Sequence, residues 1–144
     1  MSSYLLDTHV LHWLDFSPKL IPKKTFELLS RPNAQIYALS INTWEMQIKH
    51  QLGNWTEVTD FLNEYHERIL EYQMRDLAFG SAHALTLKAV PFIERADRPG
   101  QMHRDPFDRA LIAQALHENL VLISSDVNIQ AYMAHLPKFK VIWD

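Results

Sequence analysis

Four carboxylates stand where short apolar segments end or where a helix is expected to begin: Asp7, Glu45, Asp108 and Asp126. Three lie beside runs typical of buried strands or in the helices that follow them, and Asp108 opens a helix. Acidic side chains repeated at such points are costly to bury unless a positive charge lies between them, and a divalent cation supplies one. The pattern therefore predicts a metal-dependent hydrolase.

The type of ligand favours Mg²⁺ or Mn²⁺ over zinc. All four side chains offer oxygen, Ser and Thr hydroxyls lie near them in the sequence, and His and Cys do not occur at ligand spacing. A cation held in this way polarises a phosphate and lowers the pKa of an attacking water. The expected chemistry is hydrolysis of a phosphodiester bond.

Alternating strand and helix patterns predict the elements that position these acids. Strands are expected at residues 4–6, 35–39, 74–77, 121–123 and 138–142. Helices are expected after a Thr8 cap, over 21–29, from an Asn42 or Thr43 cap to Leu52, over 57–72, from Gly80 to about 90, over 105–119 and over 129–134. Such alternation implies an α/β protein with a parallel sheet flanked by helices, in which loops and helix N-termini meet at the carboxyl ends of the strands. We therefore expect the four acids to meet at one edge of the sheet.

Length and composition narrow the class of protein. A chain of 144 residues predicts one domain over 1–144. With 14 basic and 17 acidic residues the net charge is −3, so a polyanionic substrate must be held by local basic groups and metal. The chain has no cysteine, which favours a cytoplasmic protein. Asp7, His9 and His12 interrupt the apolar start, so we expect neither a signal peptide nor a membrane span.

Four ordered segments carry a family resemblance: LLDTHVLHWL, SINTWEMQIKHQLG, HRDPFDRALIAQA, and LISSD followed by Tyr132. Together they resemble the PIN-domain ribonucleases, in particular the VapC-like toxins of bacterial type II toxin-antitoxin modules. The resemblance implies a three-layer α/β/α PIN-like fold with a central parallel sheet and magnesium-dependent cleavage of RNA. It also implies a homodimer, alone or in a larger assembly with a cognate antitoxin that inhibits it.

The resemblance assigns the four acids to the acidic quartet of that family. Ser124 stands where the family has threonine, two residues before the last aspartate, and keeps the hydroxyl. The stretch from Pro91 to Arg104 is longer than the short proline-histidine loop of the family. This difference leaves open which groups line the substrate channel.

Each acid also has an ordinary structural interpretation. Asp7 and Asp126 are placed to cap the helices that follow them, and Glu45 is a first-turn acid favoured by the helix dipole. In the segment DPFD, Asp105 is a cap and Asp108 an acid three residues later. We interpret Asp105 as a cap or supporting residue and keep the other four acids as metal ligands.

Basic and hydroxyl side chains near the acids are candidates for substrate contact or support. His103 and Arg104 are predicted phosphate contacts, whereas Lys49 and Arg109 either bind phosphate or offset the acidic charge, with Asp105 as a partner for Arg109. Histidine is not needed as a general base if a metal activates the water. Thr8, Ser40 and Ser124 are the candidate supporting hydroxyls.

The aromatic residues have two interpretations. Most of Trp13, Trp44, Trp55 and Trp143 are expected in the core, with stacking on bases as the alternative. Apolar residues near the first helices are candidates for docking an antitoxin helix: Trp13, Leu14, Phe16, Leu20 and Phe26. The lysines at positions 19, 23 and 24 are expected on a solvated face.

The leading hypothesis is an endoribonuclease whose partners are RNA and an antitoxin, without a membrane. One alternative is a PIN-like scaffold that binds RNA or protein without catalysis. The other is a metal-dependent nuclease that cleaves DNA.

Overall fold

The computed structural model describes residues 2–144, in which five strands form one sheet in the order β3-β2-β1-β4-β5. The strands are β1 (Ser2–Leu6), β2 (Ala34–Leu39), β3 (Arg75–Leu77), β4 (Val121–Ile123) and β5 (Val141–Ile142). Every neighbouring pair is parallel. The chain builds the sheet from β1 through β2 to β3 and then crosses to the other side of β1. The carboxyl ends of β1 and β4 therefore form the switch point at which open α/β sheets bind ligands.

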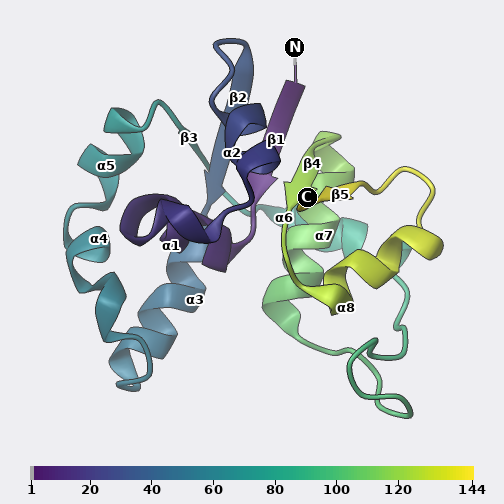
Figure 1. Cartoon of the computed structure of the whole chain (residues 1–144). Coiled ribbons are helices and arrows are strands. Elements are labelled where there is room, and N and C mark those ends of the chain that lie inside the picture. Colours follow the sequence, from purple (N-terminus) through teal and green to yellow (C-terminus); the bar gives the residue numbers. More distant parts are fainter. Residues whose placement is uncertain (1) are drawn as a thin grey trace.

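Helices cover both faces of the sheet. They are α1 (Thr8–Phe16), α2 (Lys23–Leu29), α3 (Ser40–Gln51), α4 (Thr59–Asn63), α5 (Tyr65–Glu71), α6 (Ser81–Thr86), α7 (Pro106–Glu118) and α8 (Val127–Gln130). Short 3₁₀ turns occupy Pro18–Leu20, Thr56–Val58, Leu87–Ala89 and Ala131–Ala134. Figure 1 shows α4 and α5 on one side of the sheet and α7 and α8 on the other. The predicted three-layer α/β/α arrangement is confirmed.

Two hydrophobic cores explain the three layers. Successive side chains of a strand face opposite sides of the sheet. Leu6 accordingly packs with Val10 and Leu11 of α1 in one core, whereas Leu5 packs with Leu111 and Ile112 of α7 in the other. Because both faces are covered, the central segments 4–6 and 121–123 are apolar throughout, whereas the edge strand β3 carries exposed Arg75 and Asp76.

Some helix bounds differ from the predicted ones. The helix expected over 57–72 is interrupted between α4 and α5 at exposed Glu64, whose backbone leaves the helical region. Phe61, Tyr65 and Ile69 are buried as the periodicity predicts. The pattern thus located the buried face, but it holds no information about a break on the exposed side. No helix within residues 2–144 combines the length and apolar character needed to cross a membrane.

The start of α7 matches its signals. The Asp105 side chain accepts hydrogen bonds from the backbone N–H groups of Phe107 and Asp108, and Pro106 occupies the first helical position. The helix ends at Asn119, which has the left-handed conformation typical of such ends. Asp105 is therefore confirmed as the cap.

Candidate metal centre

Asp7 lies at the carboxyl end of β1 and joins two neighbouring strands. Its Oδ1 accepts a hydrogen bond from the backbone N–H of Thr8 at 2.7 Å, and its Oδ2 accepts one from Ser124 Oγ at 2.7 Å. Asp7 itself caps α1, so the prediction that Thr8 is the cap was wrong: Thr8 is already helical, whereas Asp7 keeps an extended backbone. Ser124 follows β4, and its hydroxyl therefore links the two strand ends of the switch point.

Burial raises the pKa of Asp7 to about 7, and the negative charges of Asp108 and Glu45 act in the same direction. The hydrogen bonds from Ser124 and Thr8 oppose the rise without cancelling it. An acid held in this way carries its charge at neutral pH only with difficulty. It gains from any cation that comes between it and the neighbouring carboxylates.

Asp108, in the first turn of α7, shows the same behaviour. Burial raises its pKa to about 6, the charges of Asp105 and Asp126 add to the rise, and a hydrogen bond from His103 opposes it. Asp7 thus interacts with Asp108 and Glu45, and Asp108 with Asp126. The four predicted acids share one electrostatic neighbourhood at the carboxyl edge of the sheet.

Three of the acids have one oxygen held by the protein. Glu45 Oε2 pairs with Lys49 Nζ at 2.7 Å, and Asp108 Oδ2 lies 3.0 Å from His103 Nε2. Asp126 Oδ1 caps α8 by accepting from the N–H groups of Asn128 and Ile129. Within residues 2–144, no hydrogen bond engages the second oxygen of Glu45, Asp108 or Asp126. Each of these side chains is therefore oriented by one oxygen while the other remains for a ligand.

Asn42 is a supporting residue that the sequence interpretation treated only as a possible cap. It is fully buried in the first turn of α3, which begins at Ser40 and not at Asn42 or Thr43 as predicted. Its Nδ2 donates to Leu6 O and Thr8 Oγ1, and its Oδ1 accepts from Leu39 N. Asn42 thereby ties the end of β1 to the end of β2, and so fixes α3, which carries Glu45, relative to Asp7. The only signal in the sequence was a polar residue near the start of an expected helix.

Ser40 supports a different part of the sheet. Its Oγ donates to Leu77 O at 3.1 Å and accepts from Phe79 N at 3.0 Å. These bonds join the end of β2 to the end of β3. The observed role of Ser40 is therefore to connect strands at the outer edge of the sheet.

Two predicted phosphate contacts are buried. His103 is 2% exposed, and both of its ring nitrogens have protein partners, Asp108 and Tyr132. Arg109 is 8% exposed and donates to the carbonyls of Val90 and Pro91 instead of pairing with Asp105. Direct phosphate contact does not fit these buried side chains, because the segment from Pro91 to Arg104 folds over them, which local sequence does not show. The supporting role that was the alternative for His103 fits its bond to Asp108.

Exposed or half-buried groups with positive charge remain at the rim. Arg104 is exposed, and half-buried Lys49 pairs with Glu45, which is the charge-offsetting role foreseen for it. The Lys49 ammonium also lies 5.5 Å from the centre of the Trp55 ring, on which the exposed His9 ring stacks at 4.9 Å. His9 interacts with Glu45 and Asp126 as well as with Lys49.

The tryptophans follow the expectation with one exception. Trp55 is buried, and Trp13 and Trp143 pack half-buried against the core. Trp44 was expected inside but is 58% exposed, and it meets the ring of Phe107 edge to face at 5.1 Å. The buried side chains of α3 are Ile41, Asn42, Glu45 and Met46, and Trp44 lies on a part of the helix surface that points away from them.

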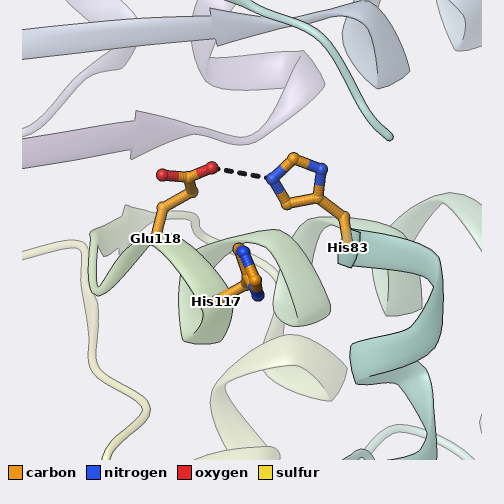
Figure 2. A group of neighbouring side chains, drawn as sticks. All are labelled: His83, His117 and Glu118. Atoms are coloured by element: carbon orange, nitrogen blue, oxygen red, sulfur yellow. Dashed lines mark hydrogen bonds and ion pairs between the residues drawn. The ribbon is translucent and has the colours of Figure 1, made fainter. Parts of the chain in front are cut away.

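A tighter group of potential ligands lies at the other end of α7. The ligand atoms of His83, His117 and Glu118 are all within 4.8 Å of one another, a compactness the four carboxylates do not reach among the described residues. Figure 2 shows His83 on α6 bonded to Glu118 near the end of α7, with His117 beside them. Asp108 and Glu118 are separated by roughly 15 Å along the helix axis.

Hydrogen bonds explain this group without a metal. His83 Nδ1 accepts from the N–H of Gly80 at 2.8 Å, so in the neutral ring the proton sits on Nε2, which donates to Glu118 Oε1 at 2.7 Å. A protonated Nε2 has no lone pair for a cation. The contacts cap α6 and tie it to α7.

No protein-family model matches the sequence, and no curated protein matches it. Solved structures do resemble it over almost their whole length. A chain of VapBC-5 from Mycobacterium tuberculosis, a member of the VapBC family of toxin-antitoxin systems, superimposes with a TM-score of 0.61 at 14% identity, covering 100% of both chains. A chain of VapBC2 from Rickettsia felis, bound to a promoter DNA fragment, gives 0.59 at 17% identity and 99% of both chains.

VapBC-1 from nontypeable Haemophilus influenzae gives a TM-score of 0.56 at 21% identity, covering 97% of this chain and 96% of that one. At such identities the similarity establishes the fold. The expected resemblance is thus confirmed at that level: the chain has a PIN-like α/β/α fold, and the solved structures that share it include members of the VapBC toxin-antitoxin systems.

Proposed function

We propose that this chain is a metal-dependent endoribonuclease and the toxin of a toxin-antitoxin pair. The observation that carries the proposal is the group of acids at the switch point: two have pKa values raised by burial and mutual repulsion, and three keep one oxygen without a protein partner. In this proposal Asp7, Glu45, Asp108 and Asp126 are the metal ligands.

The donor set fits Mg²⁺ or Mn²⁺. Every candidate ligand atom is a carboxylate oxygen, which these hard cations prefer. The carboxylates are spaced more widely than a cage that grips a bare ion, and Mg²⁺ usually keeps several waters while binding one or two carboxylates. When bound, such a cation polarises a phosphate oxygen and lowers the pKa of an attacking water.

The side chains of this chain hold the ligands and receive the substrate. Lys49 and His103 each fix one oxygen of Glu45 and Asp108, so the second oxygen of each acid is oriented before substrate arrives, whereas Thr8 and Ser124 hold both oxygens of Asp7. In this proposal Lys49, Arg104 and His9 contact the phosphates on either side of the scissile bond. The proposed substrate is RNA, held by these local groups because the net charge of −3 supplies no general attraction.

The proposed partner is an antitoxin that docks on apolar residues near the first helices. Phe16, Leu20 and Phe26 are exposed, as the sequence predicted for part of this group, whereas Trp13 and Leu14 pack against the core. Phe26 also lines a groove of about 380 Å³ between α2, β2 and the end of α5. The solved structures that share the fold include VapBC proteins, one of them described as a member of a family of toxin-antitoxin systems, which supports a protein partner. We also propose a homodimer, which sedimentation of the purified chain tests.

The test compares the wild-type chain with Asp7→Asn and with Asp60→Asn, an exposed aspartate on α4 that gives a matched loss of charge. Single-stranded RNA is incubated with each protein in Mg²⁺ and in EDTA. We expect Asp7→Asn and EDTA each to reduce cleavage by roughly 100-fold and Asp60→Asn to leave it unchanged. Undiminished cleavage in either condition contradicts the proposal.

Matched DNA and RNA oligonucleotides separate the alternatives. Cleavage of DNA in preference to RNA supports a deoxyribonuclease built on the same acids. Tight RNA binding by the wild-type chain without any cleavage in Mg²⁺ or Mn²⁺ supports a binding module.

A further inference from the structure

His103 is buried at the end of the long loop, and both of its ring nitrogens are occupied. Nδ1 lies 2.9 Å from the hydroxyl of Tyr132, and Nε2 lies 3.0 Å from Asp108 Oδ2. Tyr132 is fully buried. Because a neutral imidazole carries one N–H and one lone pair, these partners decide where the proton sits.

Two independent constraints give the same answer. Arg109 Nη1, which can only donate, lies 3.4 Å from the Tyr132 oxygen, so this oxygen accepts from Arg109. The buried hydroxyl proton of Tyr132 then needs an acceptor, and His103 Nδ1 is the one in reach. Ionised Asp108 can only accept, so it requires a proton on Nε2. Both constraints place the His103 proton on Nε2.

Arg109 is itself fixed by the start of the long loop. Its guanidinium donates to Val90 O at 3.0 Å and to Pro91 O at 2.9 Å, and it stacks on the ring of Phe92 at 3.9 Å. The loop then returns: Glu94 pairs antiparallel with Met102, and the backbone N–H of His103 donates to Ile93 O at 2.8 Å. Arg109 thus holds the start of the segment from Pro91 to Arg104, and His103 lies at its end.

We propose that Arg109, Tyr132 and His103 form a chain of hydrogen-bond donors that positions Asp108 for metal binding. Each member donates to the next, and the chain ends at Asp108 Oδ2, so that no hydrogen bond within residues 2–144 engages Oδ1. His103 is a positioning residue, and the segment from Pro91 to Arg104 holds it beside Asp108. This inference rests on the proposed function, because it assigns a role around one of the proposed ligands.

The first measurement is the protonation site of His103 in the metal-free chain, read from long-range ¹H–¹⁵N NMR spectra. We expect the proton on Nε2 in the wild type and also in Tyr132→Phe, which removes one hydroxyl and little volume and leaves Asp108 as the acceptor that requires this proton. A wild-type His103 protonated on Nδ1 overturns the proposal.

The second measurement is Mn²⁺ affinity by calorimetry. We expect Tyr132→Phe to weaken binding about tenfold, as removal of outer partners of metal ligands typically does. Tyr37→Phe is the matched control, because Tyr37 on β2 bonds only Gln35 Oε1 among the described residues. Unchanged affinity in Tyr132→Phe overturns the proposal.

A conservative pair of variants distinguishes positioning from packing. His103→Gln retains an N–H donor that reaches Asp108, whereas His103→Leu fills space without a donor. We expect His103→Gln to keep Mn²⁺ affinity within about threefold of the wild type and His103→Leu to lose tenfold or more. If a folded His103→Leu variant, shown by circular dichroism, keeps the Mn²⁺ affinity of the wild type, His103 only fills space and the proposal is overturned.

Failure of the inference differs from failure of the proposed function. If the wild type binds Mn²⁺ and cleaves RNA while Tyr132→Phe does both equally well, only the donor chain is refuted. If the wild type neither binds Mn²⁺ nor cleaves RNA, both are refuted.

Discussion

Replacing Asp7 by asparagine is expected to stabilise the metal-free protein at neutral pH. The amide oxygen of the variant still accepts from Thr8 N, and its NH₂ group donates to Ser124 Oγ in place of the present bond. The buried charge disappears, whereas most hydrogen bonds remain. The proposed metal ligand is thus a source of instability in the metal-free chain.

The magnitude follows from the pKa of Asp7, which burial and the neighbouring acids raise from 3.8 to about 7. At 1.36 kcal/mol per pH unit this displacement corresponds to roughly 4 kcal/mol of folding free energy lost above pH 7. The Ser124 hydroxyl proton loses its charged acceptor in the variant, which offsets about 1–2 kcal/mol. The expected net gain is about 2–3 kcal/mol, or roughly 5–10 °C in Tm for a chain of this size.

The pH dependence has a definite sign. Below pH 3.8 the Asp7 carboxyl is protonated in both the folded and the unfolded state. Between pH 3.8 and about 7 only the unfolded state readily releases the proton, so the contribution of Asp7 to the free energy of unfolding falls as the pH rises. The advantage of Asp7→Asn over the wild type therefore grows from near zero at about pH 4 to its full size above about pH 7.

Thermal unfolding in EDTA across this pH range, followed by circular dichroism, measures the advantage. Asp60→Asn, on the exposed surface of α4, is the control and should shift Tm by little at any pH. The reasoning is refuted if Asp7→Asn lowers Tm at pH 7.5, or if its effect is the same at the two ends of the range.

Three further outcomes are expected. Adding Mn²⁺ at neutral pH should raise the Tm of the wild type more than that of Asp7→Asn, since binding stabilises the folded state only where the site is intact. Asp126→Asn should keep the cap of α8 and unfold within about 1 kcal/mol of the wild type, but bind Mn²⁺ more weakly in calorimetry, whereas Asp105→Asn should change neither property. Asn42→Ala should lower the free energy of unfolding by about 2–4 kcal/mol in urea titrations, because Leu39 N, Leu6 O and Thr8 Oγ1 lose a buried partner.

The positions of the acids were predictable because the geometry behind them is general. Parallel strands end at the same edge, so residues that directly follow β1 and β4 must be neighbours whatever lies between them in the sequence. Asp7 and Ser124 satisfy this rule at 2.7 Å. The central strands were predictable because strands covered on both faces are largely apolar, as residues 4–6 and 121–123 are.

Part of what the sequence did not reveal depends on the path of the segment between Pro91 and Arg104. His103 and Arg109 resemble exposed phosphate contacts in the sequence, and nothing local shows that the segment between Pro91 and Arg104 folds back over them. Asn42 was missed for a related reason, since its partners come from β1 as well as β2. Trp44 was misplaced because the apolar pattern did not show that α3 buries the face of Glu45 and Met46, which Trp44 does not share.

In the sequence, capping and metal binding are competing interpretations of Asp7 and Asp126. In the structure, the cap and the proposed metal site use different features of the same carboxylates. Asp126 accepts both of its helix-capping bonds through Oδ1, and Asp7 accepts from Thr8 through Oδ1 and from Ser124 through Oδ2. A helix N-terminus also carries partial positive charge, which stabilises an ionised acid held against it. The cap therefore orients the carboxylate, and at Asp7 the hydrogen bond from Thr8 N opposes the rise of the pKa that burial causes. For that reason a capping signal directly after a buried strand is compatible with a ligand role, and the Asp126→Asn variant, which keeps the cap but removes the charge, separates the two contributions.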